Sequence, residues 1–188
     1  MSKPTAEIVL KGISVSEGLA LGSICLYRTE LDDVQDIVLE PEQIAAELDR
    51  YATALNEVGS QFIEKQERIA RSVGPKHAEI YEAYRLILED PIFQAEIPEA
   101  IQQTHQNAEG IIRKKLNSLE KKFSNIQDEY LRERIYDIRG VSRRLIYFLM
   151  QADSHCDFDS YTENILMARE LTPVDSIYFL HKSLKGIA

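Results

Sequence analysis

An apolar side chain recurs every three or four positions from residue 44 to residue 62, and Ile69 follows seven residues later. A period near 3.5 residues is typical of one arm of a helical hairpin or bundle, because it places these side chains on one face of a helix. Pro41 suits the first helical turn, where no N–H is needed, and Gly74-Pro75 ends the pattern. The stripe consists of Ile44, Leu48, Tyr51, Leu55, Val58, Phe62 and Ile69.

Two shorter helices are expected after this long one. Residues 76–90 gather apolar side chains on one face, and Asp90-Pro91 breaks the pattern because proline cannot continue a helix. Residues 92–104 predict another short helix around Ile97 and Ile101.

A second pair of helices is expected over residues 108–123 and 128–151. Asn107 is a candidate N-cap for the first of them. The break between the two is short, so they should be antiparallel neighbours. Residues 41–151 are therefore predicted to form an all-helical subdomain of two antiparallel hairpins.

The N-terminal part of the chain has β character. Residues 7–27 are rich in apolar and β-branched side chains, and Ile13 and Val15 alternate with serines, which predicts a half-buried strand. The acidic stretch 28–42 has few periodic apolar residues, and we expect it to cross from this part to the helices.

The C-terminal part returns to strand and helix. Residues 164–168 predict a short apolar strand. Thr172 is a candidate N-cap for a helix that has Leu184 on its apolar face and ends at Gly186. The fold class is therefore α+β and mainly α, with an incomplete α/β part at the two ends. The expected divisions are 1–35, 41–151 and 160–188.

Composition excludes several classes of protein. The chain has 22 basic and 31 acidic residues and a net charge of −9, so nucleic acid is not an expected partner. No apolar run approaches the roughly 20 residues that span a membrane, and the start lacks the apolar core of a signal peptide. Cys25 and Cys156 are far apart and form no C-x-x-C motif, which favours a reduced, cytoplasmic setting.

Residues 153–159 contain aspartate, histidine and cysteine, which are all common metal ligands. Their spacing matches no zinc pattern, so an acidic loop is the favoured interpretation and no metal site is expected. His77, His105 and His181 stand alone and are expected to be surface residues. No nucleophile or phosphate-loop motif occurs.

The acidic helix over 76–90 and the segment after it are candidates for docking a basic partner, since charge steers encounter and apolar anchors hold the complex. A solvated helix face is the alternative. Helix 128–151 carries a run of arginines, which is expected to serve solubility or to contact phosphate. These arginines are Arg132, Arg134, Arg139, Arg143 and Arg144.

Four stretches, in order, resemble enzyme I of the bacterial phosphotransferase system, the phosphoenolpyruvate–protein phosphotransferase family. GISVSEGLALG (12–22) resembles G-I-x-A-S-P-G-I-A-x-G, and AEIYEAYRLILEDPIF (78–93) is similar to A-x-I-F-x-A-H-x-x-L-L-x-D-P. DEYLRERIYDIRGVSRRL (128–145) resembles D-x-Y-L-x-E-R-x-x-D-I-R-D-I-x-x-R-L, and NILMARELTPVDSI (164–177) resembles I-L-V-A-x-D-L-T-P-S-x-x.

This resemblance implies a helical subdomain that docks the phosphocarrier protein HPr, inserted in a swivelling α/β subdomain that carries a phosphohistidine. It also implies a separate C-terminal domain that binds phosphoenolpyruvate and magnesium and dimerises, and that is absent here. No cofactor is expected in this chain. The implied HPr-binding residues are Glu79, Ile80, Glu82, Tyr84, Leu86, Ile87, Glu89, Phe93 and Arg134, and Ser176 takes the place of a hydroxyl residue that hydrogen-bonds the active histidine.

The family's active histidine lies in G-G-x-T-S-H beyond the L-T-P turn. The chain has no adjacent glycines and ends sixteen residues after Thr172, so we expect no catalytic residue in it and no activity alone. The family's helix-face histidine is Tyr84 here, and the aspartate after D-I-R is Gly140.

Three hypotheses therefore remain open. The chain is the N-terminal part of enzyme I, a non-catalytic helical interaction module or regulator derived from that family, or part of a related phosphoenolpyruvate-utilising enzyme with a swivelling phosphohistidine domain. The acidic helical insert favours enzyme I over the third hypothesis.

Overall fold

The computed structural model describes residues 9–27, 31, 34–123, 128–150, 164–172, 174–175 and 184–188. The side chains of residues 129–133 are also left undescribed. The helical elements are η1 (Pro41–Gln43), α1 (Ile44–Ser72), α2 (Pro75–Leu88), the π-helical turn η2 (Ile92–Glu96), α3 (Ile97–Thr104), α4 (Ala108–Phe123) and α5 (Glu129–Leu149). The strands are β1 (Ile24–Tyr27), β2 (Asn164–Ala168) and β3 (Leu184–Ile187).

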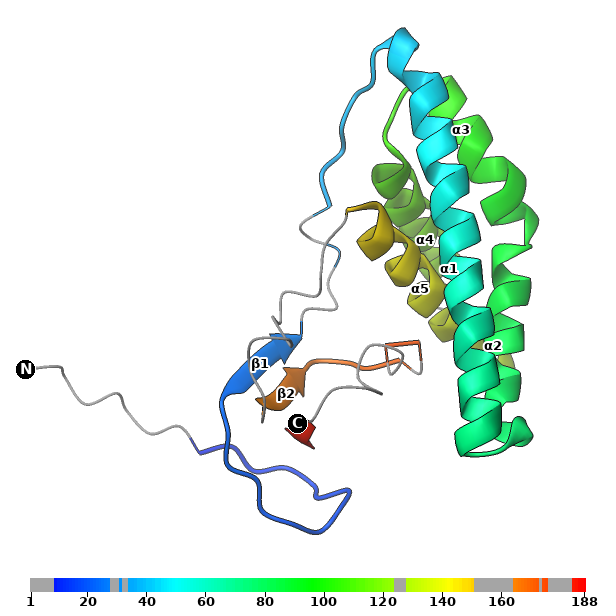
Figure 1. Cartoon of the computed structure of the whole chain (residues 1–188). Helices are drawn as coiled ribbons and strands as arrows, with labels where there is room; N and C mark the ends of the chain where they lie inside the picture. The colour runs from blue at the N-terminus through cyan, green and yellow to red at the C-terminus, as the bar shows by residue number, and fades with distance from the viewer. Residues whose placement is uncertain are drawn as a thin grey trace, which may run out of the picture.

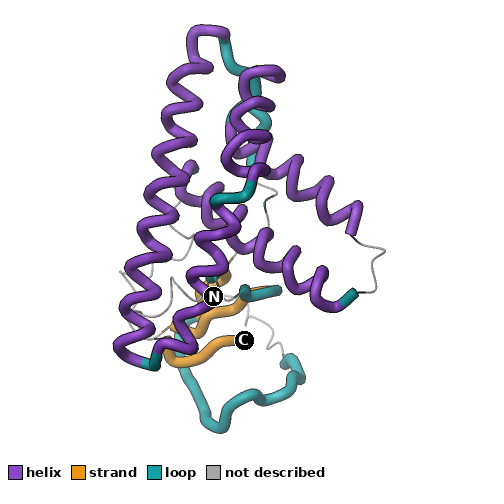
Figure 2. Tube along the Cα trace, turned by 90° about the vertical axis from the view of Figure 1, so that its right-hand side faces the viewer, coloured by secondary structure: helices purple, strands orange, loops and turns teal. Residues whose placement is uncertain are grey.

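The long helix α1 is the spine of the helical part. Figure 1 shows α2 and α3 following each other along one side of α1, while α4 and α5 lie on its other side. Figure 2 shows the same helices in a second view, with the strands near the lower end of the bundle. The five main helices agree with the sequence prediction, whereas the divisions at 1–35, 41–151 and 160–188 stay a prediction.

The apolar stripe of α1 forms the centre of the main core. Tyr51, Val58, Phe62 and Ile69 are buried, and Ile44, Leu48 and Leu55 pack against them. The ring of Phe62 lies 5.7 Å from that of Tyr84 on α2, centre to centre. Because each buried aliphatic or aromatic side chain contributes roughly 1.5–3 kcal/mol, this shared core holds the helices together.

Glycine and proline set the corner between α1 and α2. Gly74 has a φ of 122°, which side chains with a Cβ rarely adopt, and Pro75 occupies the first helical position. At the end of α3, His105 takes a left-handed conformation with a φ of 53°. The chain there turns back, and Val38 and Gln106 form a short antiparallel bridge.

The strands form a small parallel sheet in the order β1-β2-β3. In the β1–β2 register, Ile24 lies beside Ile165 and Tyr27 beside Ala168. Tyr27 and Leu166 form a second, smaller core on one face of this sheet. The helical part therefore lies in sequence between two adjacent strands of one sheet.

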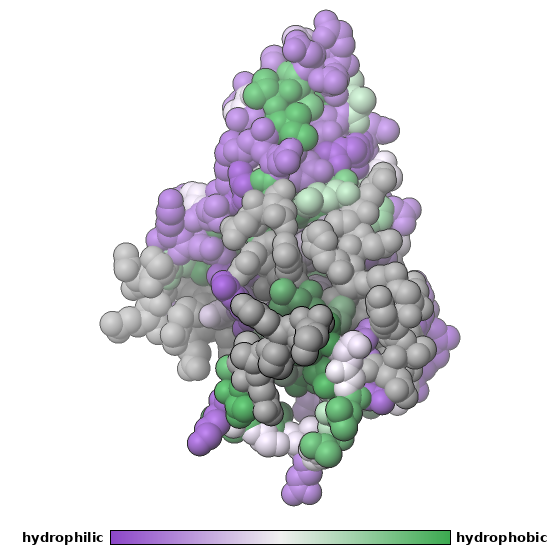
Figure 3. All heavy atoms as spheres, turned by 90° about the vertical axis from the view of Figure 1, so that its left-hand side faces the viewer, coloured by the Kyte–Doolittle hydropathy of each residue, from purple (hydrophilic) through white to green (hydrophobic). Residues whose placement is uncertain are grey.

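One strand prediction and one helix prediction, near the two ends of the chain, are wrong. Ile13 and Val15 lie in no strand, and their side chains are 95% and 101% exposed. Apolar side chains gather at the lower end of the face in Figure 3, where the segment 9–23 runs. Leu184 and Gly186 belong to β3 and not to a helix, because their backbone groups pair with β2.

The cysteine prediction also differs from the structure. Cys25, on β1, is disulfide-bonded, which does not agree with the expected reduced thiol. The other cysteine of the sequence, Cys156, lies outside the described residues.

Candidate docking face

Helix α2 turns one face to the core and the other to solvent. Its buried side chains include Tyr81 and Tyr84, whose rings meet edge to face with centres 6.0 Å apart. The opposite side carries Glu79, Glu82 and Leu86, and the C-cap residue Glu89 continues the stripe, at spacings of three, four and three residues. We call these four residues the acidic face of α2.

The acidic face combines unpaired charge with one exposed apolar side chain. All three of its glutamates are exposed and form no ion pair with another described residue. Leu86 is 50% exposed, and Ile80, at the border of the face, is 37% exposed. A surface of this kind attracts a basic partner through charge and offers an apolar contact at its centre.

Three residues predicted as part of the docking surface are wrong for that role. Tyr84, Ile87 and Phe93 are at most 2% exposed, so no partner can contact their side chains. Burial raises the pKa of Tyr84, with smaller contributions from Asp137, Tyr81 and Asp175. Its hydroxyl accepts or donates no hydrogen bond among the described residues. The resemblance implied a docking role for Tyr84, whereas its ring packs in the core beside Phe62.

The arginines of α5 point inward more than the sequence predicted. Arg143 is 2% exposed, and its Nη2 lies 3.4 Å from Asp175 Oδ2. Arg139 pairs with Glu120 of α4 at 2.6 Å and with Glu170 at 3.1 Å. The expected role in solubility is therefore wrong for these two arginines, because they connect α5 to the segment that follows β2.

Asp175 is the centre of this connection. Its Oδ2 accepts hydrogen bonds from the backbone N–H and the hydroxyl of Thr172, both at 2.6 Å. Its Oδ1 accepts a bond of 2.9 Å from the Tyr27 hydroxyl on β1. Thr172, the candidate N-cap, therefore bonds to the residue three positions later, whereas Tyr27 and Arg143 carried no sequence signal for this role.

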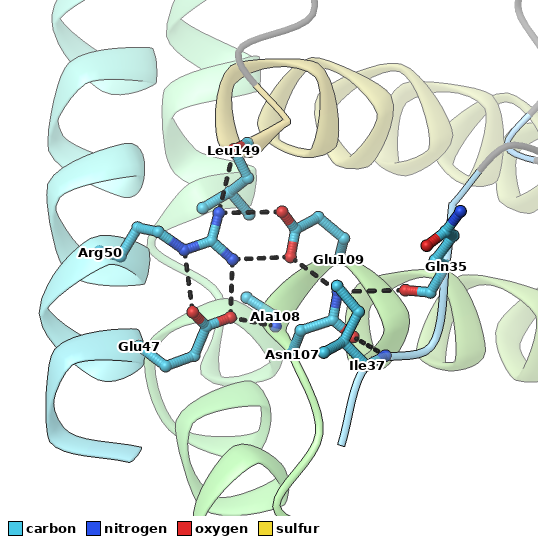
Figure 4. Close-up of polar contacts among 8 residues, drawn as sticks. All are labelled: Gln35, Ile37, Glu47, Arg50, Asn107, Ala108, Glu109 and Leu149. Atoms are coloured by element: carbon cyan, nitrogen blue, oxygen red, sulfur yellow. Dashed lines mark hydrogen bonds and ion pairs between the residues drawn. The ribbon is translucent and has the colours of Figure 1, made fainter. Parts of the chain in front are cut away.

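A second polar cluster joins α1, α4 and α5 (Figure 4). The Arg50 guanidinium donates to both Glu47 and Glu109, with distances between 2.7 and 2.9 Å, and to the Leu149 carbonyl at 3.0 Å. Glu47 also accepts a bond of 2.7 Å from the Ala108 N–H, the first of α4. The helix is thus capped from α1.

The sequence predicted that the Asn107 side chain caps α4, but in the structure it does not. Its Oδ1 accepts a bond of 3.0 Å from the Ile37 N–H, and its Nδ2 donates to the Gln35 carbonyl at 3.1 Å. Asn107 therefore fixes the crossing segment to the start of α4 (Figure 4).

The Arg50 cluster also shifts the pKa of Glu47 and of Arg50. Burial alone would raise the pKa of Glu47, but the hydrogen bonds from Arg50 and from the Ala108 N–H outweigh it, so the pKa lies below its ordinary value of 4.5. Burial disfavours the charged form of Arg50, yet its bonds to Glu109 and Glu47 raise its pKa. All of these charges are satisfied within the cluster, which makes it a structural unit and not a reactive one.

A known protein family matches a large part of this chain. The model of the family described as "PEP-utilising enzyme, N-terminal" matches residues 11–134. The chain belongs to this family.

Similar proteins of the PEP-utilising enzyme family carry a common name. The chain is 28% identical to a phosphoenolpyruvate-protein phosphotransferase of Listeria innocua over 94% of its own length. It is 30% identical to that of Haemophilus influenzae over 95% of its length. It spans 31% of the length of each of these relatives.

Solved structures agree with the family. The NMR solution structure of Enzyme I (nEIt) superposes with a TM-score of 0.72 and 26% identity, covering 95% of this chain and 72% of the other. The N-terminal domain of Enzyme 1 - Nitrogen gives a TM-score of 0.68 at 23% identity, covering 90% and 69%, which shows a shared fold.

Two residues with family-implied roles are placed only in part. Arg134 is half-buried on α5, a helix that contacts α2. Ser176 lies outside the described residues, as do 153–159 and His181.

The described part of the chain shows neither a metal-binding cluster nor a membrane-spanning helix. Among those residues, no group of three or more His, Cys, Asp or Glu is arranged to hold a metal ion. No described helix is both long enough and apolar enough to cross a membrane. His77 is exposed and His105 is half-buried, and neither belongs to a cluster.

Proposed function

We propose that this chain is the partner-docking part of a phosphoenolpyruvate–protein phosphotransferase and that it binds HPr through the acidic face of α2. The relatives bear the name of that enzyme, and the matching structures are N-terminal parts of Enzyme I. The observation that carries the proposal is a row of exposed glutamates around a half-exposed leucine.

Charged and apolar residues should affect different steps of binding. Glu79, Glu82 and Glu89 raise the rate of encounter with a basic surface, and salt screens this effect beyond about 8 Å at physiological ionic strength. Of the predicted anchors, Ile80 and Leu86 remain as those that slow dissociation, since anchors must lose water-exposed area on binding.

Phosphoryl transfer itself is proposed to need groups that this chain lacks. None of its four histidines lies in a G-G-x-T-S-H context. The described residues do not fit a magnesium site, so no step through magnesium is assigned to them. We expect no acid-labile phosphate on the chain after incubation with phosphoenolpyruvate and magnesium, because transfer needs a nucleophile and a bound substrate. Dimerisation through a further domain is proposed from the resemblance alone, and a cytoplasmic location is proposed from the spacing of the cysteines.

An amide-shift titration of the labelled chain with HPr tests the docking proposal. Shifts should cluster at Glu79–Glu89 of α2 and grow weaker as salt rises. Glu82→Lys should abolish or greatly reduce them at low salt. Asp49→Lys is the matched control, because Asp49 is an exposed acid on the first turns of α1, far along the bundle from α2.

Two outcomes would count against the proposal. The absence of shifts at millimolar HPr would favour an interaction module with a different partner. Equal effects of Glu82→Lys and Asp49→Lys would mean that only net charge matters and that α2 is not the docking face.

A further inference from the structure

Helix α5 comes unusually close to the turn that follows β2. Gly140 is buried at the point of contact. A methyl group on its Cα would lie 2.9 Å from Val174 Cγ2, 3.1 Å from Thr172 Oγ1 and 3.2 Å from Val174 Cβ. Contacts below about 3.4 Å force neighbours to move, and a packed interior resists such movement.

Polar contacts surround this close approach. Arg143, one helical turn after Gly140, reaches Asp175 at 3.4 Å and Glu170 at 3.8 Å. Asp175 is tied in turn to Tyr27 of β1. The turn after β2 therefore contacts α5 on one side and the sheet on the other.

We propose that Gly140 is a positioning residue: the lack of a side chain there lets α5 pack against Thr172, Val174 and Asp175 and holds the helical bundle and the sheet in one fixed orientation. The polar contacts require this packing because they span short distances. A side chain at position 140 would lift α5 from the turn and lengthen the contacts of Arg143 with Asp175. The proposal concerns the chain itself and does not depend on which partner binds α2.

A matched pair of substitutions separates this effect from helix propensity. Gly140→Ala and Gly59→Ala both replace a glycine inside a helix by a better helix former. At Gly59 the new methyl group would meet only Leu88 Cδ1, at 3.9 Å, which is ordinary contact. Any gain from propensity is therefore common to both variants, and the clash is confined to Gly140→Ala.

The orientation is measured by residual dipolar couplings of backbone amides. In the unaltered chain and in Gly59→Ala, one alignment tensor should fit the amides of α1, α2, β1 and β2 together. In Gly140→Ala, the helical and sheet amides should need separate tensors. The amides of Thr172 and Asp175, which are both hydrogen-bonded, should exchange with solvent at least about tenfold faster than in the control.

A second substitution keeps the test decisive if Gly140→Ala is poorly folded. Val174→Ala removes the Cγ2 atom at 2.9 Å, the tightest of the three contacts, but keeps those of Thr172 Oγ1 and Cβ of residue 174, so Gly140→Ala/Val174→Ala should recover part of the slower exchange and of the fit to a single tensor. The proposal is overturned if the unaltered chain already needs two tensors. It is also overturned if Gly140→Ala keeps one tensor with unchanged exchange, or if the double variant shows no recovery.

Discussion

The Tyr27 hydroxyl on β1 donates a hydrogen bond of 2.9 Å to Asp175, 148 positions later in the chain. The same carboxylate accepts from Thr172 and faces Arg143 of α5. One buried aspartate thus joins the first strand, the turn after the second strand and the last described helix.

Removing the Asp175 carboxylate should cost far more than removing the Tyr27 hydroxyl. Asp175→Ala leaves the buried Arg143 charge and the Thr172 N–H without this acceptor, so we expect a loss of about 3–5 kcal/mol in the free energy of unfolding. Tyr27→Phe removes one bond and should cost about 1 kcal/mol. Urea unfolding monitored by circular dichroism gives both values, and equal losses would contradict the central role of Asp175.

The buried Tyr84 should tolerate loss of its hydroxyl but not of its ring. Its oxygen finds no hydrogen-bond partner among the described residues, so Tyr84→Phe should leave stability unchanged or raise it by about 1 kcal/mol. Tyr84→Ala should cost about 3–5 kcal/mol through the cavity it creates. Thermal unfolding of the two variants tests this, and a Phe variant as unstable as the Ala variant would refute the placement.

Acid should destabilise the chain in part through Glu47. Its pKa is lower in the folded state than its ordinary value of 4.5, so the unfolded chain binds a proton more readily. The stabilisation is complete above that value and is lost as pH falls through the folded pKa. Glu47→Gln should flatten the fall in unfolding free energy below pH 4.5, whereas the exposed Glu57→Gln should not. Urea unfolding across this pH range measures both slopes.

Charge and apolar contact on α2 should affect different rate constants of HPr binding. Glu82→Lys should lower the association rate, most strongly at low salt. Leu86→Ala should leave association unchanged and raise the dissociation rate by an amount equivalent to roughly 1–2 kcal/mol. Stopped-flow kinetics at two salt concentrations separates the two, and a salt-independent association rate would be inconsistent with electrostatic steering.

Local patterns predicted the helices well because each depends on residues close in sequence. The stripe through Tyr51 and Phe62 and the corner at Gly74-Pro75 specify their structures without help from distant residues. Strand β2 was also predicted at its observed bounds, since a short apolar run has few alternatives beside turn residues.

Tertiary contacts decided the features that sequence could not predict. The resemblance implied that Tyr84 and Leu86 both contact a partner, but the Tyr84 ring packs beside Phe62 of α1 in the core and only Leu86 of the two is exposed. The Ile13–Val15 alternation predicted a strand, but a strand needs a partner to pair with, and no described strand pairs there. Gly186 reads as a helix end in sequence, yet pairing with β2 places it in a strand.

The neighbouring strands β1 and β2 impose an order on how the chain reaches its structure. Ile24 pairs with Ile165, 141 positions later, and closing a loop of that length in an unfolded chain costs about 4 kcal/mol of entropy. The helical hairpins between them close over short distances and can form first, which brings the two ends together before they pair. The parallel sheet should therefore be a late folding event whose rate depends on the helices, so a substitution in the α1 core should delay strand pairing as well as helix packing.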